Sequence, residues 1–273
     1  MKQYLNLLRH TLENGTHKPN RTGIDTRNIF GQTMRFNMAD GFPAMTTKKL
    51  AFNAVKAELL WFISGSSDVK DLQKLGCRIW DANAEADYWK PKARFDGDLG
   101  RVYGVQWRSW QTPDNKTVDQ LKNAIAQIKK NPNDRRIIVS AWNPGELDQM
   151  ALPPCHMFFQ FFVADGKLSL SMYQRSCDMF LGVPFNIASY SLLLHMVAQV
   201  TGLKPGEFVH ILGDTHIYQN HFEQVREQLT RTPYPLPQLW LNSEIKDIEQ
   251  FTMDDIKLIN YQSHPTIKAQ MAV

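Results

Sequence analysis

The chain has 273 residues, of which 43% are hydrophobic and seven are tryptophan, so it can bury a sizeable core. No linker-like, repetitive or low-complexity stretch divides it, and we expect a single domain over residues 1–273. The net charge of +4, from 31 basic and 27 acidic residues, suits an anionic small molecule as well as weak contact with RNA and selects neither. The three cysteines show no Cys-x-x-Cys spacing, which argues against a disulfide framework or zinc site and favours a reducing compartment.

Several classes of protein are disfavoured because their sequence patterns are missing. There is no G-x-G-x-x-G or G-x-x-x-x-G-K-[ST] motif, so a nicotinamide-binding Rossmann fold or a P-loop is unsupported. We find no run of the ~18 apolar residues that a membrane span needs, and the N-terminal segment, which contains Glu13, does not read as a signal peptide. No cluster of Lys and Arg with interleaved aromatics indicates nucleic-acid binding. We therefore expect a cytoplasmic protein that binds no membrane.

Taken in chain order, hydrophobic periodicity predicts helices over 1–14, 51–64, 68–75, 117–130 and 186–201, with a further helix that opens at 213–218 and continues to about 229. It predicts strands over 28–36, 137–142, 157–164 and 167–174. The polar segment 84–98 reads as a surface excursion. Because strands and helices mix without regular βαβ alternation, the expected fold class is α+β with a mixed β-sheet packed against helices.

Two finer features follow from the same patterns. In the strand over 28–36, alternation places Phe30, Met34 and Phe36 on one side. In the helix over 117–130, Thr117 and Gln120 have the spacing of a capping box at its N-terminus. A metal site built on His216 and His221 is not expected, since residues five apart do not share a helical face.

The segment 151–190 carries the most informative pattern. Its two strands, 157–164 and 167–174, are separated only by an Asp-Gly pair, which predicts a tight β-hairpin. The hairpin returns the chain antiparallel, so Cys155 at its entry should lie near Arg175 at its exit. An arginine beside a thiol stabilises the thiolate and lowers the thiol pKa, so Cys155 is a candidate nucleophile.

Two other interpretations of Cys155 remain at this point. A lone cysteine beside a hairpin is more often a small core residue, and spacing alone makes Cys155 a candidate and no more. A hydrolase-type pair with His156 is disfavoured, because neighbouring residues in extended chain point to opposite faces.

Three unbroken blocks then give a family resemblance. Pro154-Cys155-His156, Tyr173-Gln-Arg-Ser-Cys-Asp178 and Pro184-Phe-Asn-Ile-Ala-Ser-Tyr190 closely resemble the folate-dependent thymidylate synthase family, and the resemblance extends over essentially the whole chain. It implies reductive methylation of dUMP to dTMP, with 5,10-methylenetetrahydrofolate as donor of carbon and hydride and without a metal. It also implies a homodimer whose sheets pack back to back, with 84–98 as an insertion.

The resemblance assigns roles around the pyrimidine. Cys155 would add to pyrimidine C6, Glu58 would be a buried carboxylate whose raised pKa suits general acid–base work, and Tyr103 would relay a proton. The implied catalytic residues are Cys155, Glu58, Tyr103, Arg175, Asn186 and Asp178. The implied dUMP-binding residues are Arg21, Arg135, Arg136, Arg175, Ser176, Asp178, Asn186, His216 and Tyr218. Arg135 and Arg136 would reach the phosphate of the partner subunit, since guanidinium groups bind phosphate through two hydrogen bonds at once.

The folate contacts are also implied by the resemblance. Ile79 and Trp80 would form a wall against the flat pterin ring, Asp178 would bind the pterin, and Lys48 would lie near the folate tail. The full implied set is Lys48, Ile79, Trp80, Asp178, Leu181, Gly182, Phe185 and Ala272. For Trp80 the alternative is a core residue, and for Lys48 and Arg21 it is a solvated surface charge.

Two rival functions stay open from sequence. One is a nucleotide hydroxymethylase, in which water rather than hydride reacts with the methylene intermediate; Trp80 and the C-terminal tail argue against it. The other is an RNA-binding regulator, which the pI of 8.9 permits. The product formed from dUMP and methylenetetrahydrofolate would separate these functions.

Overall fold

The computed structural model describes residues 1–20 and 23–270. The strands in these residues are β1 (Thr16–Lys18), β2 (Thr26–Asn37), β3 (Trp110–Gln111), β4 (Thr117–Val118), β5 (Ile138–Ser140), β6 (His156–Ala164), β7 (Lys167–Asp178), β8 (Lys204–Tyr218), β9 (Gln238–Leu241) and β10 (Ile256–Ile259). The α-helices are α1 (Lys2–Asn14), α2 (Phe52–Ser64), α3 (Val69–Lys74), α4 (Asp81–Ala84), α5 (Tyr103–Arg108), α6 (Gln120–Lys130), α7 (Gly182–Thr201) and α8 (Phe222–Thr230).

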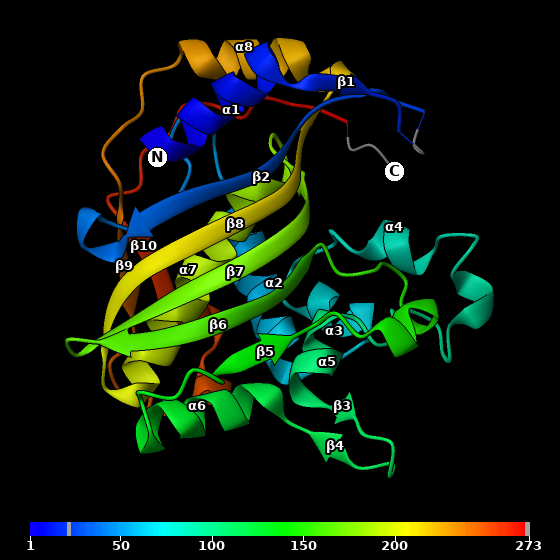
Figure 1. The fold of residues 1–273 in the computed structure, drawn as a ribbon, viewed down its shortest axis with the longest axis vertical. Helices are drawn as coiled ribbons and strands as arrows, with labels where there is room; N and C mark the ends of the chain where they lie inside the picture. The colour runs from blue at the N-terminus through cyan, green and yellow to red at the C-terminus, as the bar shows by residue number, and fades with distance from the viewer. Residues whose placement is uncertain (21–22, 271–273) are drawn as a thin grey trace.

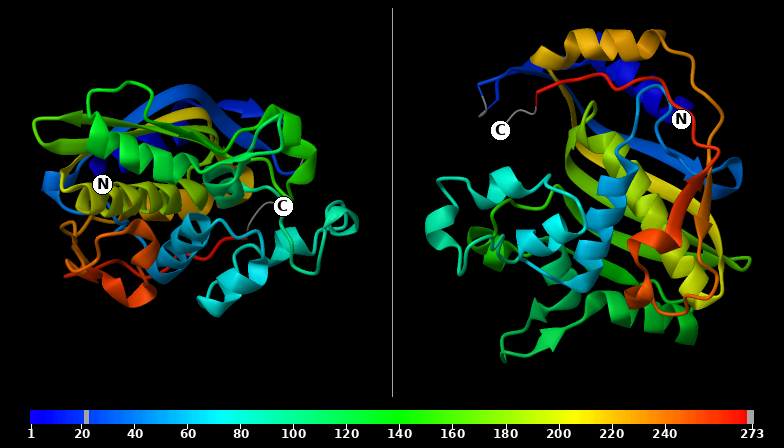
Figure 2. Two further views of the ribbon diagram at one scale, coloured as in Figure 1. Left: turned by 90° about the horizontal axis from the view of Figure 1, so that it is seen from below. Right: turned by 180° about the vertical axis from the view of Figure 1, so that it is seen from behind.

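One mixed sheet organises the described residues, with strand order β1-β2-β8-β7-β6-β5. Its neighbouring strands are antiparallel except for β7 and β8, which run parallel. Parallel neighbours need a crossover connection, and α7 supplies it. Figure 1 shows α7 and α2 on one side of the sheet, and the reverse view in Figure 2 shows the same two helices in front of it. This arrangement confirms the expected α+β class with a mixed sheet.

Helix α7 forms the centre of the core. Most of its residues are buried, and Gly202 ends it in the left-handed conformation, with φ at 73°. Against our expectation from sequence, α7 is long and apolar enough to cross a membrane by length and composition. However, 78% of its most apolar window is buried inside the protein, as in the core helix of a globular domain. It packs on β7 and β8, the strands that it connects.

Helix α6 begins later than the sequence pattern indicated. Thr117 lies in β4, and the N-cap is Asp119, whose side chain accepts a hydrogen bond from the Lys122 amide. The predicted capping box with Thr117 is therefore wrong. The cause is local: Asp119 is itself a strong N-cap residue, and Gln120 instead donates to the main chain of Gln106 and Ser140.

The segment 213–218 is also not helical. It forms the last part of β8, and α8 starts only at Phe222. The strand 204–212 was not foreseen, because Pro205, Gly206 and Gly213 are residues that usually mark turns. The error matters for function, because residues two apart on a strand share a face whereas on a helix they do not.

The side-chain alternation predicted for β2 fails at one position. Met34 and Phe36 are buried, at 3% exposure each, but Phe30 is 82% exposed. Gly31 lies between them with φ at 74°, and this left-handed residue interrupts the regular alternation of the strand. Phe30 therefore lies on the surface.

The segment 84–98 is mostly exposed, as expected of a surface excursion, but two residues anchor it. Trp89 is buried, and its indole N–H donates to the main-chain oxygen of Asp98 at 2.7 Å. The buried carboxylate of Asp98 pairs with Arg94 at 2.7 Å.

Helix α5, which follows the segment 84–98 in sequence, packs against α2. The contact between α5 and α2 depends on Gly104. A Cβ added there would lie 2.4 Å from the Phe62 main-chain oxygen, closer than real contacts permit. We expect Gly104→Ala to lower the free energy of unfolding by about 1–3 kcal/mol, because the helices must separate. Urea denaturation measures this loss as a lower midpoint with an unchanged slope. In the control Gly145→Ala, the added Cβ meets only Asn143 Oδ1 at 3.6 Å; an equal loss there would contradict the steric explanation.

Candidate active site

The hairpin forms as predicted and brings Cys155 to Arg175. Asp165 and Gly166 both have positive φ, 51° and 68°, which is the backbone of a two-residue hairpin turn. At the open end of the hairpin, the Arg175 amide donates to the Cys155 main-chain oxygen at 2.8 Å. The thiol residue and the arginine are therefore held side by side by main-chain pairing.

The Arg175 side chain also supports the loop that leads to Cys155. Its Nε donates to the Pro154 oxygen at 2.8 Å, and its Nη2 donates to the Pro153 oxygen at 2.9 Å. The guanidinium group lies 5.4 Å from the ring centre of Trp142. A guanidinium has five N–H donors, so these two bonds leave three for a ligand.

Arg175 lowers the pKa of the Cys155 thiol, as expected from sequence, but burial has the larger effect. Burial raises the pKa of Cys155, and although Arg175 lowers it, with help from hydrogen bonds of Tyr103 and Ser176, the net shift is upward. The lowering by Arg175 is therefore present as expected, but it does not decide the net pKa of Cys155. Desolvation of the thiolate outweighs one nearby positive charge.

Tyr103 contacts Cys155 and stacks on His156. The Cys155 amide donates to the Tyr103 hydroxyl at 2.8 Å, and the Tyr103 ring stacks on the His156 ring with centroids 4.2 Å apart. His156 Nδ1 lies 2.7 Å from the Tyr190 hydroxyl. Burial lowers the pKa of His156 to about 3, so the imidazole is neutral. Its Nδ1 is engaged by Tyr190 rather than by the thiol, in line with the rejected Cys–His pair.

Glu58 is buried and is connected to Tyr103 through Trp80. It lies on α2 with 6% exposure, and its Oε1 accepts a hydrogen bond from the indole N–H of Trp80 at 2.7 Å. Burial raises the pKa of Glu58 to about 7, against a smaller lowering by the Trp80 bond. The Trp80 ring in turn packs edge-on against Tyr103 with centroids 5.8 Å apart. A carboxyl group that titrates near neutral pH is thus linked through two aromatic rings to the Cys155 backbone.

A cavity of about 870 Å³ opens at Cys155. Five residues expected at the site line it: Cys155, Arg175, Ser176, His216 and Tyr218. Sequence reasoning missed other lining residues, among them Lys18, Asn28, Tyr88, Trp142 and Asp214. The last of these could have been found from alternation, since Asp214, His216 and Tyr218 occupy every second position of β8.

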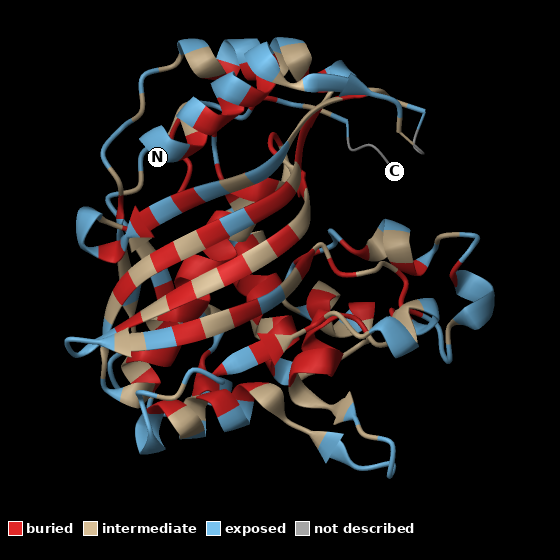
Figure 3. Cartoon of the chain, viewed as in Figure 1, coloured by how far each residue is buried: buried red, intermediate tan, exposed pale blue. Residues whose placement is uncertain are grey.

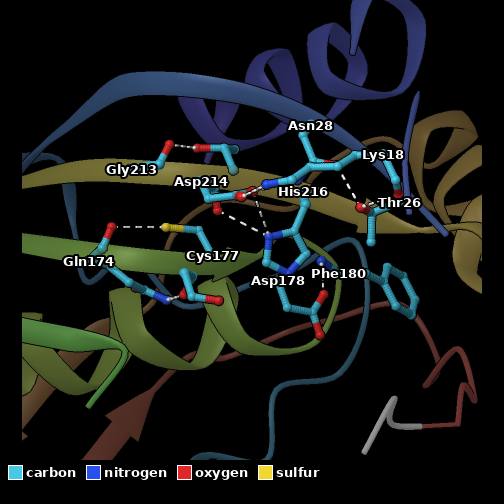
Figure 4. Close-up of polar contacts among 12 residues, drawn as sticks. Lys18, Thr26, Asn28, Gln174, Cys177, Asp178, Phe180, Gly213, Asp214 and His216 are labelled. Atoms are coloured by element: carbon cyan, nitrogen blue, oxygen red, sulfur yellow. Dashed lines mark hydrogen bonds and ion pairs between the residues drawn. The ribbon is translucent and has the colours of Figure 1, made fainter. Parts of the chain in front are cut away.

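Asp214 organises the wall of the cavity that β8 provides. Figure 4 shows Asn28 and His216 beside Asp214. Lys18 Nζ lies 2.9 Å from Asp214 Oδ2, Asn28 donates to Oδ1, and His216 Nδ1 lies 3.3 Å from Oδ1. Hydrogen bonds from His216, Lys18 and Asn28 hold the pKa of Asp214 well below its usual value, although burial opposes them. The ring of His216 is thereby fixed in direction.

Asp178 and Asn186 stand at the junction of β7 and α7. Asp178 Oδ1 accepts hydrogen bonds from the amides of Phe180 at 3.0 Å and Leu181 at 3.2 Å, which turns the chain into the helix. Among the described residues, Asp178 Oδ2 has no hydrogen-bond partner. Asn186 is half-buried on α7, and its Oδ1 accepts a hydrogen bond from Gln174 at 3.1 Å. Asp178 lies directly opposite His216 in the sheet, next to the cavity.

The residues expected to bind folate differ in accessibility. Ile79 is 40% exposed, whereas Trp80 is only 6% exposed and packs on Trp61 as well as Tyr103. Leu181, Gly182 and Phe185 are half-buried at the start of α7. Lys48 is buried rather than solvated: its amine donates to the Phe180 oxygen, and burial lowers its pKa to about 8.

The arginines expected at the phosphate are not all brought together. Arg135 and Arg136 precede β5, are exposed, and do not line the cavity. The Arg135 oxygen accepts a hydrogen bond from Gln160, which places the pair about 17 Å along β6 from Cys155. Arg136 pairs with Asp134 at 3.0 Å. Arg21 and Ala272 lie outside the described residues.

Glu58 makes the stability of the fold depend on pH. Below pH 4.5 it is protonated in both states, and between 4.5 and about 7 only the folded state keeps the proton. The free energy of unfolding, compared with that of Glu58→Gln, should therefore fall by up to about 3 kcal/mol as the pH rises through this window, then stay constant. Denaturant titrations of both proteins at several pH values measure the difference. A difference that stays flat, or rises with pH, would contradict the buried neutral carboxyl.

Comparison with models of known protein families identifies the family of this chain. The model of the family described as Thymidylate synthase matches residues 2–273, which is essentially the whole chain. The match includes every residue that lines the cavity, as well as the helix with Glu58. The chain belongs to the thymidylate synthase family.

Proposed function

We propose that the cavity at Cys155 is the place where this methyltransferase converts dUMP to dTMP, with Cys155 as the nucleophile. Family membership establishes the overall reaction, the methylation of dUMP. The observation that supports the location is the single cavity wall formed by Cys155, Arg175 and Ser176, which presents a thiol beside a guanidinium group and a hydroxyl. A nucleotide needs this combination, since its phosphate binds cations and its C6 accepts a sulfur nucleophile.

Cys155 reacts as the thiolate. Its Sγ forms a bond to C6 of the pyrimidine, the electron pair of the C5–C6 double bond moves toward O4, and C5 becomes nucleophilic. When the sulfur leaves, the C6–S electron pair returns to it. Arg175 and the hydrogen bonds of Tyr103 and Ser176 favour the thiolate, while burial opposes it. Glu58, with a pKa of about 7, can both donate and accept a proton near this centre.

The nucleotide is held at both ends. Arg175 and Ser176 bind the phosphate, together with Arg21 and with Arg135 and Arg136 of a second subunit. His216 and Tyr218 bind the sugar 3′-hydroxyl from β8, and Asn186 reads the edge of the uracil. The support for the sugar contact is that His216 and Tyr218 both line the cavity and that Asp214 fixes the His216 ring.

The residues at the start of α7 fit a folate. The family uses 5,10-methylenetetrahydrofolate, which supplies the added carbon and the hydride. Asp178 offers a carboxylate oxygen without a partner in the described chain, and Leu181, Gly182 and Phe185 are half-buried at the start of α7. Ile79 offers an exposed apolar side chain. These residues, with Trp80, Lys48 and Ala272, would hold the pterin and its tail. Lys48 would do so after its amine leaves the Phe180 oxygen.

The enzyme is proposed to act as a homodimer through the free face of its sheet. Figure 3 shows exposed and intermediate stripes along the strand face that no helix covers. Large apolar side chains of four strands are exposed in the described chain: Phe30 at 82%, Phe162 at 65%, Ile138 at 45%, Phe158 at 40% and Ile211 at 36%. Monomeric proteins rarely leave such a patch in water, and a two-fold axis would pair it with itself. A reactive Cys155 also favours the reducing cytoplasm.

Replacement of the nucleophile should separate chemistry from binding. We expect Cys155→Ser to lower kcat by at least about a thousandfold while the Kd for dUMP stays within about tenfold, because the arginines supply most of the ground-state affinity. The formation of dihydrofolate and the calorimetric Kd are the two measurements. The control Cys77→Ala changes a buried cysteine that does not line the cavity and should retain turnover. Turnover of Cys155→Ser at a tenth of the wild-type rate would refute the nucleophile.

Mixing variants tests the shared site. Arg136→Ala and Cys155→Ser should each be inactive, but their 1:1 mixture under subunit exchange should regain about a quarter of wild-type activity, since half of the dimers then hold one intact site. The matched control mixes Arg175→Ala with Cys155→Ser. No activity should return there, because both residues serve the same subunit's cavity. A mixture of the first pair that stays inactive would remove the cross-subunit role of Arg136.

A further inference from the structure

Gln174 is a buried residue to which the proposed reaction assigns no role. It precedes Arg175 on β7, is 2% exposed, and makes three side-chain hydrogen bonds. Its Nε2 donates to the Ser176 main-chain oxygen at 2.9 Å and to Asn186 Oδ1 at 3.1 Å. Its Oε1 lies 2.9 Å from His210 Nε2. Figure 4 shows Gln174 with Cys177, whose thiol donates to the Gln174 main-chain oxygen.

The direction of the Gln174 amide follows from one of these partners. The two ends of an amide have the same shape, so only hydrogen bonding can tell them apart. A main-chain carbonyl oxygen can accept hydrogen bonds but cannot donate them. The end of Gln174 that faces the Ser176 oxygen must therefore be the NH₂ group, and the end that faces His210 must be the oxygen.

His210 completes this side of the network. Because Gln174 Oε1 only accepts, His210 Nε2 must carry a hydrogen. His210 is fully buried, and burial lowers its pKa to about 3, so the ring is neutral and its Nδ1 is bare. Consistent with this tautomer, Nδ1 is buried and has no hydrogen-bond partner among residues 1–20 and 23–270. Gln174 is thus held from two sides.

The consequence reaches Asn186. The Gln174 NH₂ group needs an acceptor, so Asn186 must turn its Oδ1 toward Gln174. The Asn186 NH₂ group makes no hydrogen bond to the described chain, and the side chain is half-buried, so this donor is available to a ligand. Uracil presents an acceptor at position 4, whereas cytosine presents an amino donor there. To match cytosine, Asn186 would have to turn its own NH₂ group against that of Gln174.

We propose that Gln174, held between the Ser176 carbonyl and His210, is a specificity-determining residue that fixes the Asn186 amide for uracil and against cytosine. The inference rests on the proposed function, in which Asn186 reads the pyrimidine edge. Asparagine alone does not discriminate, because a free amide can rotate and match either base. The preference for uracil over cytosine comes from the orientation of the Asn186 amide. This orientation is imposed by Gln174, which is itself oriented by the Ser176 main-chain oxygen. Gln174 is a positioning residue that need not touch the nucleotide.

Calorimetric binding of dUMP and dCMP to wild type and to Gln174→Met tests the proposal. The wild type should prefer dUMP. Methionine keeps the size of the side chain but has no NH₂ group, so Asn186 is released, and the preference should fall by about tenfold. The affinity for dCMP should rise in absolute terms, which a general loss of structure would not produce. The matched control is Gln228→Met, another fully buried glutamine, which donates to Thr47 at 3.0 Å and does not line the cavity. It should leave the preference unchanged.

A second measurement needs no variant. Nitrogen NMR of wild-type protein labelled on histidine should show His210 with its hydrogen on Nε2 and a bare Nδ1. A hydrogen on Nδ1 would reverse the network and overturn the proposal, as would a full dUMP preference in Gln174→Met. Failure of the wild type to bind dUMP, or to prefer it over dCMP, would instead overturn the proposed function, while the His210 signal would still report the local geometry.

Discussion

The parallel pairing of β7 with β8 is the constraint on which the rest of the site depends. Strands that run parallel cannot be joined by a tight turn, so the chain must cross over through α7 on one face of the sheet. This one connection places three sources of functional groups beside each other. Arg175, Ser176 and Asp178 end β7, Asn186 lies in the first turns of α7, and His216 returns on β8 opposite Asp178. The hairpin with β6 then adds Cys155 to the same end of the sheet.

Burial shifts the pKa values of the ionisable groups near Cys155. Removal from water disfavours every charged form, so it raises the pKa of the Glu58 carboxyl and the Cys155 thiol and lowers that of the His156 imidazole. All three groups are shifted toward neutrality. Asp214, which accepts hydrogen bonds from three side chains, is instead held in its ionised form. The ionised carboxylate of Asp214 lies on β8, whereas beside Cys155 the positive charge comes from the Arg175 guanidinium group.

The features that sequence predicted well are those decided by local chemistry. The Asp-Gly turn, the strands on either side of it and the apolar α7 form as expected, because positive φ and continuous burial each have a strong sequence signature. The errors arise where tertiary contacts decide. β8 contains turn-forming residues but is a central strand, since β2 and β7 pair with both of its edges. Lys18 was missed because its role depends on pairing with a residue nearly two hundred positions away in sequence. Asp214 was missed because the segment 213–218 was predicted to be a helix and is a strand. The family resemblance supplied residue identities that pattern alone left open.

Two features are incomplete in a single chain: the proposed phosphate-binding site and the cover of the apolar sheet face. A second subunit would complete both. The proposed phosphate-binding residues Arg135 and Arg136 lie beside Gln160 in the middle of β6, away from Cys155, and the free face of the sheet exposes apolar side chains. A subunit related by a two-fold axis would cover this face, and because the axis exchanges the ends of the sheet, it would also carry each arginine pair toward the other cavity. Covering the apolar face and completing the phosphate site are then one event. Under the proposed function, the cavity at Cys155 would therefore be complete only in the dimer.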